Sequence, residues 1–473
     1  MDETRVRGLK KIGTPVDCDV LGRTAAADAT RAAEPVLRFH LLGLLGILVR
    51  SLTAACVLAT VLAGCASPTA RDPRDAAPGS SAAEPSAAGP RFAQGGPEAD
   101  DYGASDGYPI GARGACQRVA FLVGCQSHFD QVYEGRLVHR GTTPSTLARA
   151  ASEPAIRYEY QGQTFTLDDY LTRNPATGLL VARGDTILVE RYQYARHDRH
   201  RFTSWSMAKT VTAMLIGIAI AEGRIRSVDD AAAAYVPALA EKEYGKTSLR
   251  HLLRMSSGVR FIEEYTGNGD VSRLAADTIR QVGSGGVEAV TPFNVRVAPP
   301  GTRFYYASVE TQVLGLVLRN ALGRPVADYL QEKIWEPMGA EADATWLIDR
   351  AGQEATYCCL NAVLRDYARL GLLLAHDGYW RGRQIIPAAW IKEATIVHPG
   401  QPQPATGRYG YQVWILAGDQ RMFALRGIRG QAIFVDPASR LVMVHAAVRR
   451  QARDPGVRET NALWRSLVQQ LGH

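Results

Sequence analysis

The stretch that decides the fold of this chain is Arg201-Phe202-Thr203-Ser204-Trp205-Ser206-Met207-Ala208-Lys209. It leads into an apolar run, Thr210 to Glu222, which is hydrophobic nearly all round and is therefore typical of a helix buried inside a large domain. The run is too short, and too interrupted by charge at its end, to cross a membrane. We therefore predict a central helix with Ser206 at its head.

Ser206 and Lys209 have the spacing of an activated serine. Three residues are nearly one helical turn, so both side chains lie on one face. A serine hydroxyl is a weak nucleophile until a base takes its proton. An ammonium in apolar surroundings, at the positive end of a helix dipole, has its charged form disfavoured, so a neutral Lys209 could be that base. Ser-x-x-Lys alone is expected about once by chance in such a chain, and its weight comes from this context.

A second segment supplies a partner, Pro299-Pro300-Gly301-Thr302-Arg303-Phe304-Tyr305-Tyr306-Ala307-Ser308. It is typical of a turn that leads into a polar-aromatic corner, and a helix-like run from Thr311 to Ala321 follows. A phenol beside a lysine passes protons between nucleophile and leaving group, which makes Tyr306 a candidate catalytic residue. A tyrosine whose hydroxyl is only a structural anchor is the alternative, and this segment alone does not decide between them.

Together these motifs resemble those of the penicillin-recognising serine hydrolases, the superfamily of serine β-lactamases, D-alanyl-D-alanine peptidases and related esterases. Within it, the chain is most similar to the 6-aminohexanoate-dimer hydrolase-like, class C-related branch. The resemblance runs from about Gly107 to the C-terminus. It rests on five motifs in the family's order: Ser206-Met207-Ala208-Lys209, Thr247-Ser248-Leu249-Arg250-His251-Leu252-Leu253-Arg254-Met255-Ser256-Ser257-Gly258, Pro300-Gly301-Thr302-Arg303-Phe304-Tyr305-Tyr306-Ala307-Ser308, Arg365-Asp366-Tyr367-Ala368-Arg369-Leu370-Gly371 and Gly427-Ile428-Arg429-Gly430-Gln431.

The resemblance implies a role for each residue of the site. Ser206 attacks an acyl carbon while Lys209, helped by Tyr306, takes its proton; Tyr306 then protonates the leaving group, and water cleaves the acyl-serine. The backbone N–H of Ser206 and that of Ile428, on an edge strand, form the oxyanion hole. Gly427, without a Cβ, lets the backbone approach the substrate closely. No metal and no organic cofactor are expected.

Two departures from the family pattern bear on the substrate. Tyr306-Ala307-Ser308 stands where Tyr-x-Asn is common, and Leu425-Arg426-Gly427 stands where penicillin targets have Lys-Thr-Gly. Because that lysine holds the carboxylate of β-lactams, its absence favours ester or amide hydrolysis. Ser308 and Arg426 are candidate substrate contacts. Arg426 or Arg429 could hold an anionic group, although a solvated surface arginine is the usual default.

Substrate choice is expected to lie in the polar loop from Phe261 to Asp270, because such loops often act as lids. Tyr265 is its candidate substrate contact, and an ordinary exposed loop tyrosine is the alternative.

Two other patterns imitate functional motifs. Gly103-Ala104-Ser105-Asp106-Gly107 satisfies Gly-x-Ser-x-Gly, but that motif needs a strand before it and a helix after it, and neither is indicated here, so we interpret it as linker. His197-Asp198-Arg199-His200 has two histidines in a basic stretch, which we interpret as a solvated surface loop rather than a metal site.

The N-terminal region predicts export. The short apolar stretch from Ser51 to Val61 is followed by Leu62-Ala63-Gly64-Cys65, which resembles a bacterial lipoprotein signal with lipidation at Cys65. We expect residues 1–65 to be this export segment and the mature protein to be anchored to the membrane in the periplasm or cell envelope. Residues 1–49 are long for such a signal, and translation from Val49 would leave Arg50 as its positive flank.

Composition divides the rest of the chain. Residues 66–105 are rich in Ala, Pro, Ser and Gly, which predicts a flexible tether, and residues 106–473 can bury the core of one two-lobed hydrolase domain. The net charge of +7 falls to +5 once the eight basic and six acidic residues before Cys65 are removed, too small an excess to indicate a nucleic-acid partner.

Exported proteins form disulfides, so the cysteines of the domain are candidates. Cys116 and Cys125 are near enough in sequence to pair. Adjacent Cys358 and Cys359 are expected not to bond, because the ring would be strained, and to be buried apolar residues instead.

Strand patterns stand at both ends of the domain. Thr177 to Tyr192 predicts two strands around a Gly-Asp turn, and Gln431 to Val448 repeats the pattern. Helices are predicted between these ends, and Asn461 to Leu471 closes the chain as another. We therefore predict an α/β (α+β) fold: an antiparallel sheet flanked by helices, with a mostly helical lobe inserted after Lys209 and the site between the lobes.

Three functions remain open at this point. The leading hypothesis is a serine hydrolase for a small carboxylic ester, amide or short peptide. The second is a β-lactamase or D-amino-acid peptidase acting on penicillin-like or peptidoglycan substrates. The third is a catalytically silent envelope binding lipoprotein, against which the joint presence of Ser206, Lys209 and Tyr306 argues.

Overall fold

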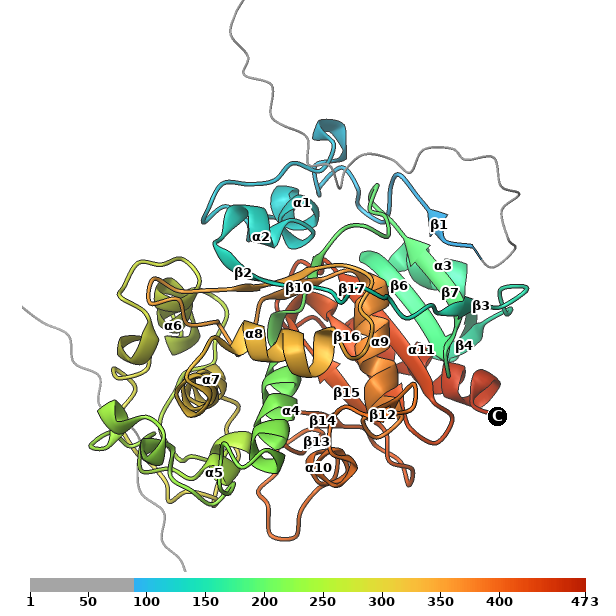
Figure 1. Ribbon diagram of the computed structural model, residues 1–473. Coiled ribbons are helices and arrows are strands. Elements are labelled where there is room, and N and C mark those ends of the chain that lie inside the picture. The colour runs from blue at the N-terminus through green and yellow to red at the C-terminus, as the bar shows by residue number, and fades with distance from the viewer. Residues whose placement is uncertain (1–88) are drawn as a thin grey trace, which may run out of the picture. The chain divides into compact units, whose positions relative to one another are not determined.

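Two β-hairpins from opposite ends of the domain meet in the middle of the main sheet (Figure 1). The computed structural model describes residues 89–473. β6 (Ala176–Arg183) and β7 (Thr186–Tyr192) form one hairpin, and β16 (Ala432–Asp436) and β17 (Leu441–Ala447) form the other. β17 pairs antiparallel with β6 and joins them. The first hairpin turns at Gly184, where a φ of +66° suits a residue without Cβ.

The main sheet is antiparallel at its centre and has parallel strands at one edge. Within residues 89–473 its order is β1-β7-β6-β17-β16-β15-β14-β13, and β3 also pairs with β7. β1 and β3 run parallel to β7. The strands that extend the two hairpins are β1 (Arg91–Phe92), β3 (Ala148–Arg149), β13 (Arg408–Tyr409), β14 (Trp414–Ile415) and β15 (Phe423–Arg426).

Helices cover both faces of this sheet. α9 (Leu364–Ala375) packs on β6, β16 and β17, and α11 (Val457–Leu471) packs on the opposite side with β4 and β17. Alternate residues of β17 divide between the two sides: Val442 and Val444 belong to the core cluster with α9, while Leu441 and Met443 belong to the cluster with α11.

The helical lobe lies beside the sheet, and α4 runs between them in Figure 1. α4 (Ala208–Ala221) is buried on nearly all sides, as its sequence predicts. It packs on α7 (Ser308–Leu322), which also contacts α5 (Leu249–Leu253) and α6 (Asp270–Thr278). The predicted architecture, an antiparallel sheet flanked by helices with a helical lobe after Lys209, is confirmed.

A second, smaller sheet holds the chain on its way into α4. Its order is β2-β9-β10-β8. The strands are β2 (Gly135–Val138), β9 (Ala344–Leu347), β10 (Leu360–Ala362) and β8 (Phe202–Thr203), and β8 leads directly to Ser206. The remaining helices and strands are α1 (Leu122–Gln126), α2 (Phe129–Val132), α3 (Leu167–Arg173), α8 (Val326–Leu330), α10 (Ala388–Ala394), β4 (Arg157–Tyr160), β5 (Gln163–Thr166), β11 (Tyr379–Trp380) and β12 (Arg383–Gln384).

The linker predicted at 66–105 is wrong over its last part. From residue 89 the chain is folded: β1 adds to the main sheet, and Tyr102 is fully buried in a small cluster with Tyr194. The aromatic residues of this part bury apolar area, and the average composition of residues 66–105 does not reveal them. The Gly-x-Ser-x-Gly stretch forms a 3-10 turn over Ala104–Asp106, not a strand and helix.

The predicted export segment at 1–65, Cys65 and the linker up to residue 88 lie outside the described residues. Among residues 89–473, no helix is long and apolar enough to cross a membrane.

Both cysteine pairs of the described chain are disulfides. Cys116 and Cys125 are bonded, with their Cα atoms 5.5 Å apart. Cys358 and Cys359 are also bonded to each other, so the expectation that these neighbours stay unbonded is wrong. The backbone accommodates the small ring because Cys359 adopts a φ of +67°.

Candidate active site

Ser206 stands on a tight turn between β8 and α4. Trp205 has a φ of +43°, an uncommon conformation for a residue with a side chain. Its indole packs against the ring of Phe129, with the centroids 5.2 Å apart, which holds the turn in place. The turn presents Ser206 at the head of α4, where it is partly exposed while its neighbours are buried.

Lys209 is buried directly beneath Ser206. Its Nζ lies 2.9 Å from Ser206 Oγ, 3.1 Å from Ser308 Oγ and 2.9 Å from the carbonyl oxygen of Tyr357. These three acceptors match the three N–H bonds of an ammonium. Burial nevertheless lowers the pKa of Lys209 from 10.5 to about 7, and the charge of Glu263 opposes that fall. A large fraction of Lys209 is therefore neutral near pH 7 and able to accept a proton.

The phenol of Tyr306 also contacts the side chain of Ser206. Its ring lies 5.1 Å from Lys209 Nζ and stacks on Trp414 at 5.7 Å. Burial raises the pKa of Tyr306 above its ordinary value, and a hydrogen bond with Ser206 partly opposes the rise. The phenol is therefore protonated at neutral pH, so Lys209 is able to accept a proton there and Tyr306 is able to donate one.

Glu263 is a member of this site that the sequence analysis missed. Its carboxylate is buried and accepts hydrogen bonds from the Ser308 N–H at 2.8 Å, the Ser308 hydroxyl at 2.7 Å and the Tyr265 hydroxyl at 2.6 Å. Ser308 therefore links Lys209 to Glu263 and is itself buried. The only sequence signal was an acidic residue two positions before the singled-out Tyr265.

Tyr265 forms part of a polar cover on this side of the site. Its hydroxyl is bound to Glu263, and the guanidinium of Arg453 lies 5.3 Å from its ring centroid. Arg453 also donates a hydrogen bond to the Glu263 carbonyl at 3.1 Å. Arg453 belongs to the loop before α11, and no pattern in the sequence connected that loop with the loop from Phe261 to Asp270.

Gly427 brings the end of β15 against the turn of Ser206. A Cβ at Gly427 would lie 2.5 Å from the Ser204 carbonyl oxygen and 2.9 Å from Trp205 Cβ. Glycine is therefore required here for close packing against the Ser206 turn. The predicted close approach of this backbone to substrate stays a prediction. Ile428, in the following 3-10 turn, is not on an edge strand, because β14 and β13 continue the sheet beyond β15.

The two backbone amides predicted to form the oxyanion hole belong to Ser206 and Ile428. Among the backbone hydrogen bonds of turns and loops within residues 89–473, none has the Ser206 N–H or the Ile428 N–H as its donor. The two amides lie on the two segments, the Ser206 turn and the end of β15, that pack together. Paired amides of this kind can stabilise a developing oxyanion.

Residues 166–466 match the family model described as Beta-lactamase. The chain belongs to the beta-lactamase family. It is similar to the 6-aminohexanoate-dimer hydrolase of Paenarthrobacter ureafaciens, with 25% identity over 310 residues, which are 62% of this chain and 78% of that protein. A solved structure from Bacillus anthracis, provisionally assigned as a 6-aminohexanoate-dimer hydrolase, superposes with a TM-score of 0.69 at 22% identity and covers 76% of this chain and 96% of its own.

This member of the beta-lactamase family has no cation on β15 that faces Ser206. Leu425 is buried in the core cluster beside α4. The prediction that Arg426 contacts substrate is wrong, because successive strand residues point to opposite faces. Arg426 lies on the α11 side, 2.9 Å from Asn461 Oδ1 and 5.5 Å from the ring centroid of Phe434. Arg429 donates to the carbonyls of Arg449 and Arg450.

The two histidines of the His197–His200 stretch are buried, not solvated as predicted. The two imidazoles are 3.9 Å apart between centroids, and the His197 N–H donates to His200 Nδ1 at 3.0 Å. No group of three or more metal-binding side chains is found among residues 89–473.

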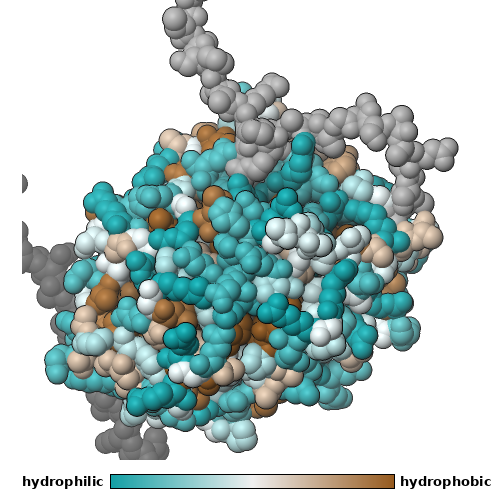
Figure 2. Space-filling view, viewed as in Figure 1, coloured by the Kyte–Doolittle hydropathy of each residue, from teal (hydrophilic) through white to brown (hydrophobic). Residues whose placement is uncertain are grey.

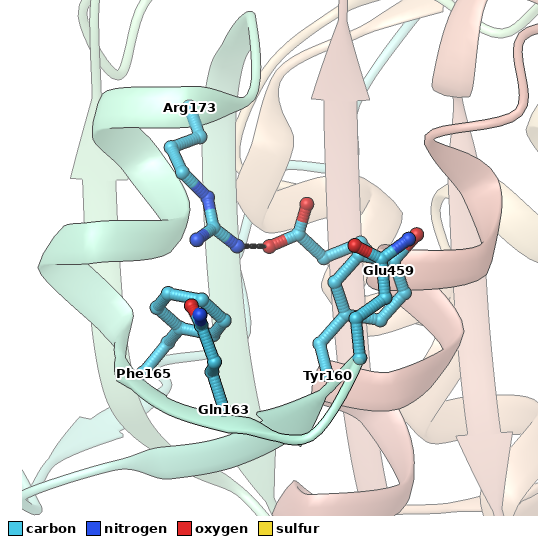
Figure 3. Close-up of a pocket in the computed structure, with 6 residues that line it drawn as sticks. Tyr160, Gln163, Phe165, Arg173 and Glu459 are labelled. Carbon is cyan, nitrogen blue, oxygen red and sulfur yellow. Dashed lines mark hydrogen bonds and ion pairs between the residues drawn. The ribbon is translucent and has the colours of Figure 1, made fainter.

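Neither the face shown in Figure 2 nor the cavity shown in Figure 3 offers a second candidate active site. Figure 2 shows a face on which hydrophilic residues surround small, separate hydrophobic patches. A cavity of about 280 Å³ lies between β4, β5, α3 and α11. Figure 3 shows the residues that line it. Arg173 forms an ion pair with Glu459 in this cavity, and its guanidinium lies 3.6 Å from the Phe165 ring centroid. The two charged groups that line the cavity are therefore paired with each other.

Proposed function

We propose that this chain is a serine hydrolase that cleaves a carboxylic ester or amide through an acyl-serine intermediate. The observation that carries the proposal is the buried Lys209 Nζ at 2.9 Å from Ser206 Oγ, with its pKa lowered to about 7. A scaffold has no use for a lysine that is desolvated against a partly exposed serine. General-base activation of a nucleophile requires that arrangement.

The proposed mechanism uses each side chain in the protonation state that its surroundings favour. Neutral Lys209 takes the proton of Ser206 as Oγ attacks the acyl carbon, and the N–H groups of Ser206 and Ile428 receive the oxyanion. The new ammonium keeps Ser308 Oγ and the Tyr357 carbonyl as acceptors. Tyr306 protonates the leaving group and regains a proton from Lys209. Water then attacks the acyl carbon by the reverse sequence.

Small linear esters and amides fit the site better than penicillins. The β15 position that carries a lysine in penicillin targets is the buried Leu425, and Arg426 faces α11. Similarity to a 6-aminohexanoate-dimer hydrolase favours amides of short linear acids. A β-lactamase or D-amino-acid peptidase is the alternative, and micromolar reaction with a fluorescent penicillin would favour it.

The proposal is tested by intact-mass spectrometry of the purified full-length protein after exposure to a fluorophosphonate. One adduct is expected on the wild type and on Ser105→Ala, whose exposed serine lies in the Gly-x-Ser-x-Gly stretch. No adduct is expected on Ser206→Ala. Labelling of Ser206→Ala, or no labelling of any folded protein, would refute the assignment and favour a silent binding protein.

We also propose that the protein is exported and anchored through a lipid on Cys65. The apolar stretch before Cys65 supports export. The two disulfides in the described domain support an oxidising compartment. The mass of the N-terminal peptide from the membrane fraction tests it. A lipidated Cys65 is expected, and a Cys65→Ser protein is expected to remain unprocessed.

A further inference from the structure

The segment Ala355–Leu360 supports both halves of the proposed catalytic pair from behind. The Tyr357 carbonyl accepts a hydrogen bond from Lys209 Nζ at 2.9 Å. Three residues later, the Leu360 N–H donates to Ser204 Oγ at 3.1 Å, and the Leu360 carbonyl accepts from the Ser204 N–H at 2.7 Å. One short stretch of backbone therefore fixes the lysine and, through Ser204, the turn that presents Ser206.

The Cys358–Cys359 disulfide lies between these two contacts. A bond between neighbouring residues closes a small ring through their peptide unit, which removes most of the rotational freedom of that backbone. Cys359 has a φ of +67°, in the left-handed region that residues with a Cβ rarely adopt. The ring holds this conformation, and with it the angle between the Tyr357 carbonyl and the Leu360 N–H.

Neighbouring groups fix the outer side of the same segment. The Cys358 carbonyl accepts from Trp346 Nε1 at 2.9 Å, and the Cys359 carbonyl accepts from the Leu347 N–H at 3.2 Å. Both carbonyls therefore point to β9, which leaves the Tyr357 carbonyl as the one that faces Lys209. The sulfur atoms of Cys358 and Cys359 form no hydrogen bond with Ser206 or Lys209. The disulfide can therefore affect these two residues only through the backbone of its segment.

We propose that the Cys358–Cys359 disulfide is a positioning device for acyl transfer, which sets the Tyr357 carbonyl on Lys209, and that its reduction impairs turnover. The inference rests on the proposed function. A dithiol would supply the two electrons: the S–S bond breaks, each cysteine sulfur gains one hydrogen, and the two sulfurs of the dithiol lose those hydrogens and bond to each other. Cys359 is then free to leave the left-handed region and move the Tyr357 carbonyl.

The test measures kcat, KM and the pH dependence of kcat on one ester, before and after incubation with dithiothreitol. It compares the full-length wild type with C358S/C359S, C358S/C359G and C116S/C125S, and peptide mapping after alkylation reports each cysteine. Reduction is expected to lower kcat at least about tenfold in the wild type and in C116S/C125S, with KM within about twofold, because Lys209 is displaced while the binding surface is kept.

The variants without the ring separate positioning from general stability. C358S/C359S is expected to start with the low kcat and not to respond to dithiothreitol. C358S/C359G is expected to recover part of kcat, since glycine adopts a φ of +67° without help. The ascending limb of the pH profile is expected to move to lower pH in the reduced wild type, because the ammonium has lost an acceptor. A merely destabilised protein would keep that limb in place.

Several results would overturn the proposal. One is an unchanged kcat and pH limb in wild type whose Cys358 and Cys359 have both been reduced and alkylated. Alkylation of both residues without any reductant would be another. If dithiothreitol does not reduce the buried Cys358–Cys359 bond, full activity in folded C358S/C359S would overturn the proposal. If C358S/C359S does not fold, the comparison of oxidised and reduced wild type decides. Failure of the proposed function is distinct, because the oxidised wild type would then neither turn over ester nor take up fluorophosphonate.

Discussion

The hydroxyl of Ser308 donates a hydrogen bond to Glu263 Oε1 at 2.7 Å while it accepts one from Lys209 Nζ at 3.1 Å. A single hydroxyl therefore separates a buried carboxylate from the buried lysine. The negative charge favours the ammonium, and burial favours the neutral amine. The two effects are opposed, and the pKa of Lys209 at about 7 is their balance.

Replacing Glu263 by Gln is expected to shift the base to lower pH. If neutral Lys209 is the base, kcat/KM of the wild type should rise with pH and level off above about 7. In Glu263→Gln the ammonium loses its nearby negative charge, the pKa of Lys209 falls, and the ascending limb moves to lower pH. A pH profile of kcat/KM for a neutral ester measures the shift directly.

Glu264→Gln is the matched control, since Glu264 is the exposed neighbour on the same loop. Its profile should coincide with that of the wild type. A limb that stays in place in Glu263→Gln, or moves to higher pH, would show that Lys209 is not the group that titrates.

Replacing Tyr306 by Phe is expected to remove the proton donor to the leaving group. Loss of a positioned general acid typically costs about 10² to 10⁴ in rate. Because burial keeps the phenol protonated, the loss should be large for amides and alkyl esters, whose leaving groups need the proton. It should be small for p-nitrophenyl esters, whose leaving group departs as an anion.

Tyr305→Phe is the control for this pair of substrates. Tyr305 is 39% exposed and adjacent in sequence, so its loss should affect both substrates equally little. Equal losses for amide and p-nitrophenyl ester in Tyr306→Phe would mean that Tyr306 acts on the attack of Ser206 alone.

Local patterns in the sequence were sufficient for most of the fold. Each hairpin has its turn residues between two apolar runs, so the strands followed from the spacing of apolar residues. The run after Lys209 is apolar all round, so the burial of its helix followed in the same way. The Ser206–Lys209 contact followed from the pitch of a helix. The sequence left two roles open for Tyr306, a catalytic acid or a structural anchor. The structure places its ring 5.1 Å from Lys209 Nζ, and the comparison of substrates in Tyr306→Phe decides between the two roles.

Contacts between distant segments were not accessible in the same way. Glu263 and Arg453 meet through two loops that no local rule pairs, 190 residues apart. The direction of Arg426 depends on the register of β15, and a change of one residue would have reversed it. The bond between Cys358 and Cys359 depends on the left-handed backbone at Cys359, which no glycine signals.

Replacing Gly427 by Ala is expected to disturb the site through packing. The added Cβ would lie 2.5 Å from the Ser204 carbonyl oxygen, so the end of β15 must move away from the Ser206 turn. We expect kcat to fall by roughly 10² or more, because a displacement of about 1 Å at the oxyanion amides has that cost. Steady-state kinetics and a crystal structure of the variant measure both effects.

Gly95→Ala is the control for the glycine substitution. The nearest heavy atom to a Cβ at Gly95 is 3.9 Å away, and its φ is not positive, so the variant should keep its activity. Full activity in Gly427→Ala would show that the two segments need not touch.

Glu310 predicts a pH dependence of stability that is independent of catalysis. It is buried on α7, with Oε1 bound to the Ser257 hydroxyl at 2.6 Å and Oε2 without a partner among the described residues. Burial raises the pKa of Glu310 from 4.5 to about 8. Between those values the native protein holds a proton that the unfolded chain releases, so the free energy of unfolding falls as pH rises from about 4.5 to 8.

In Glu310→Gln, the free energy of unfolding is expected to lose the pH dependence that Glu310 contributes. The difference in unfolding free energy, wild type minus variant, should decrease by several kcal/mol, on the order of 4, between pH 5 and pH 8.5. Urea titrations at several pH values measure it, and Asp366, whose pKa burial raises to about 7, is present in both proteins and cancels. Glu241→Gln, with a side chain 93% exposed, should run parallel to the wild type. A constant difference between wild type and Glu310→Gln would mean that Glu310 is ionised in the native core, with a counter-charge or water on Oε2.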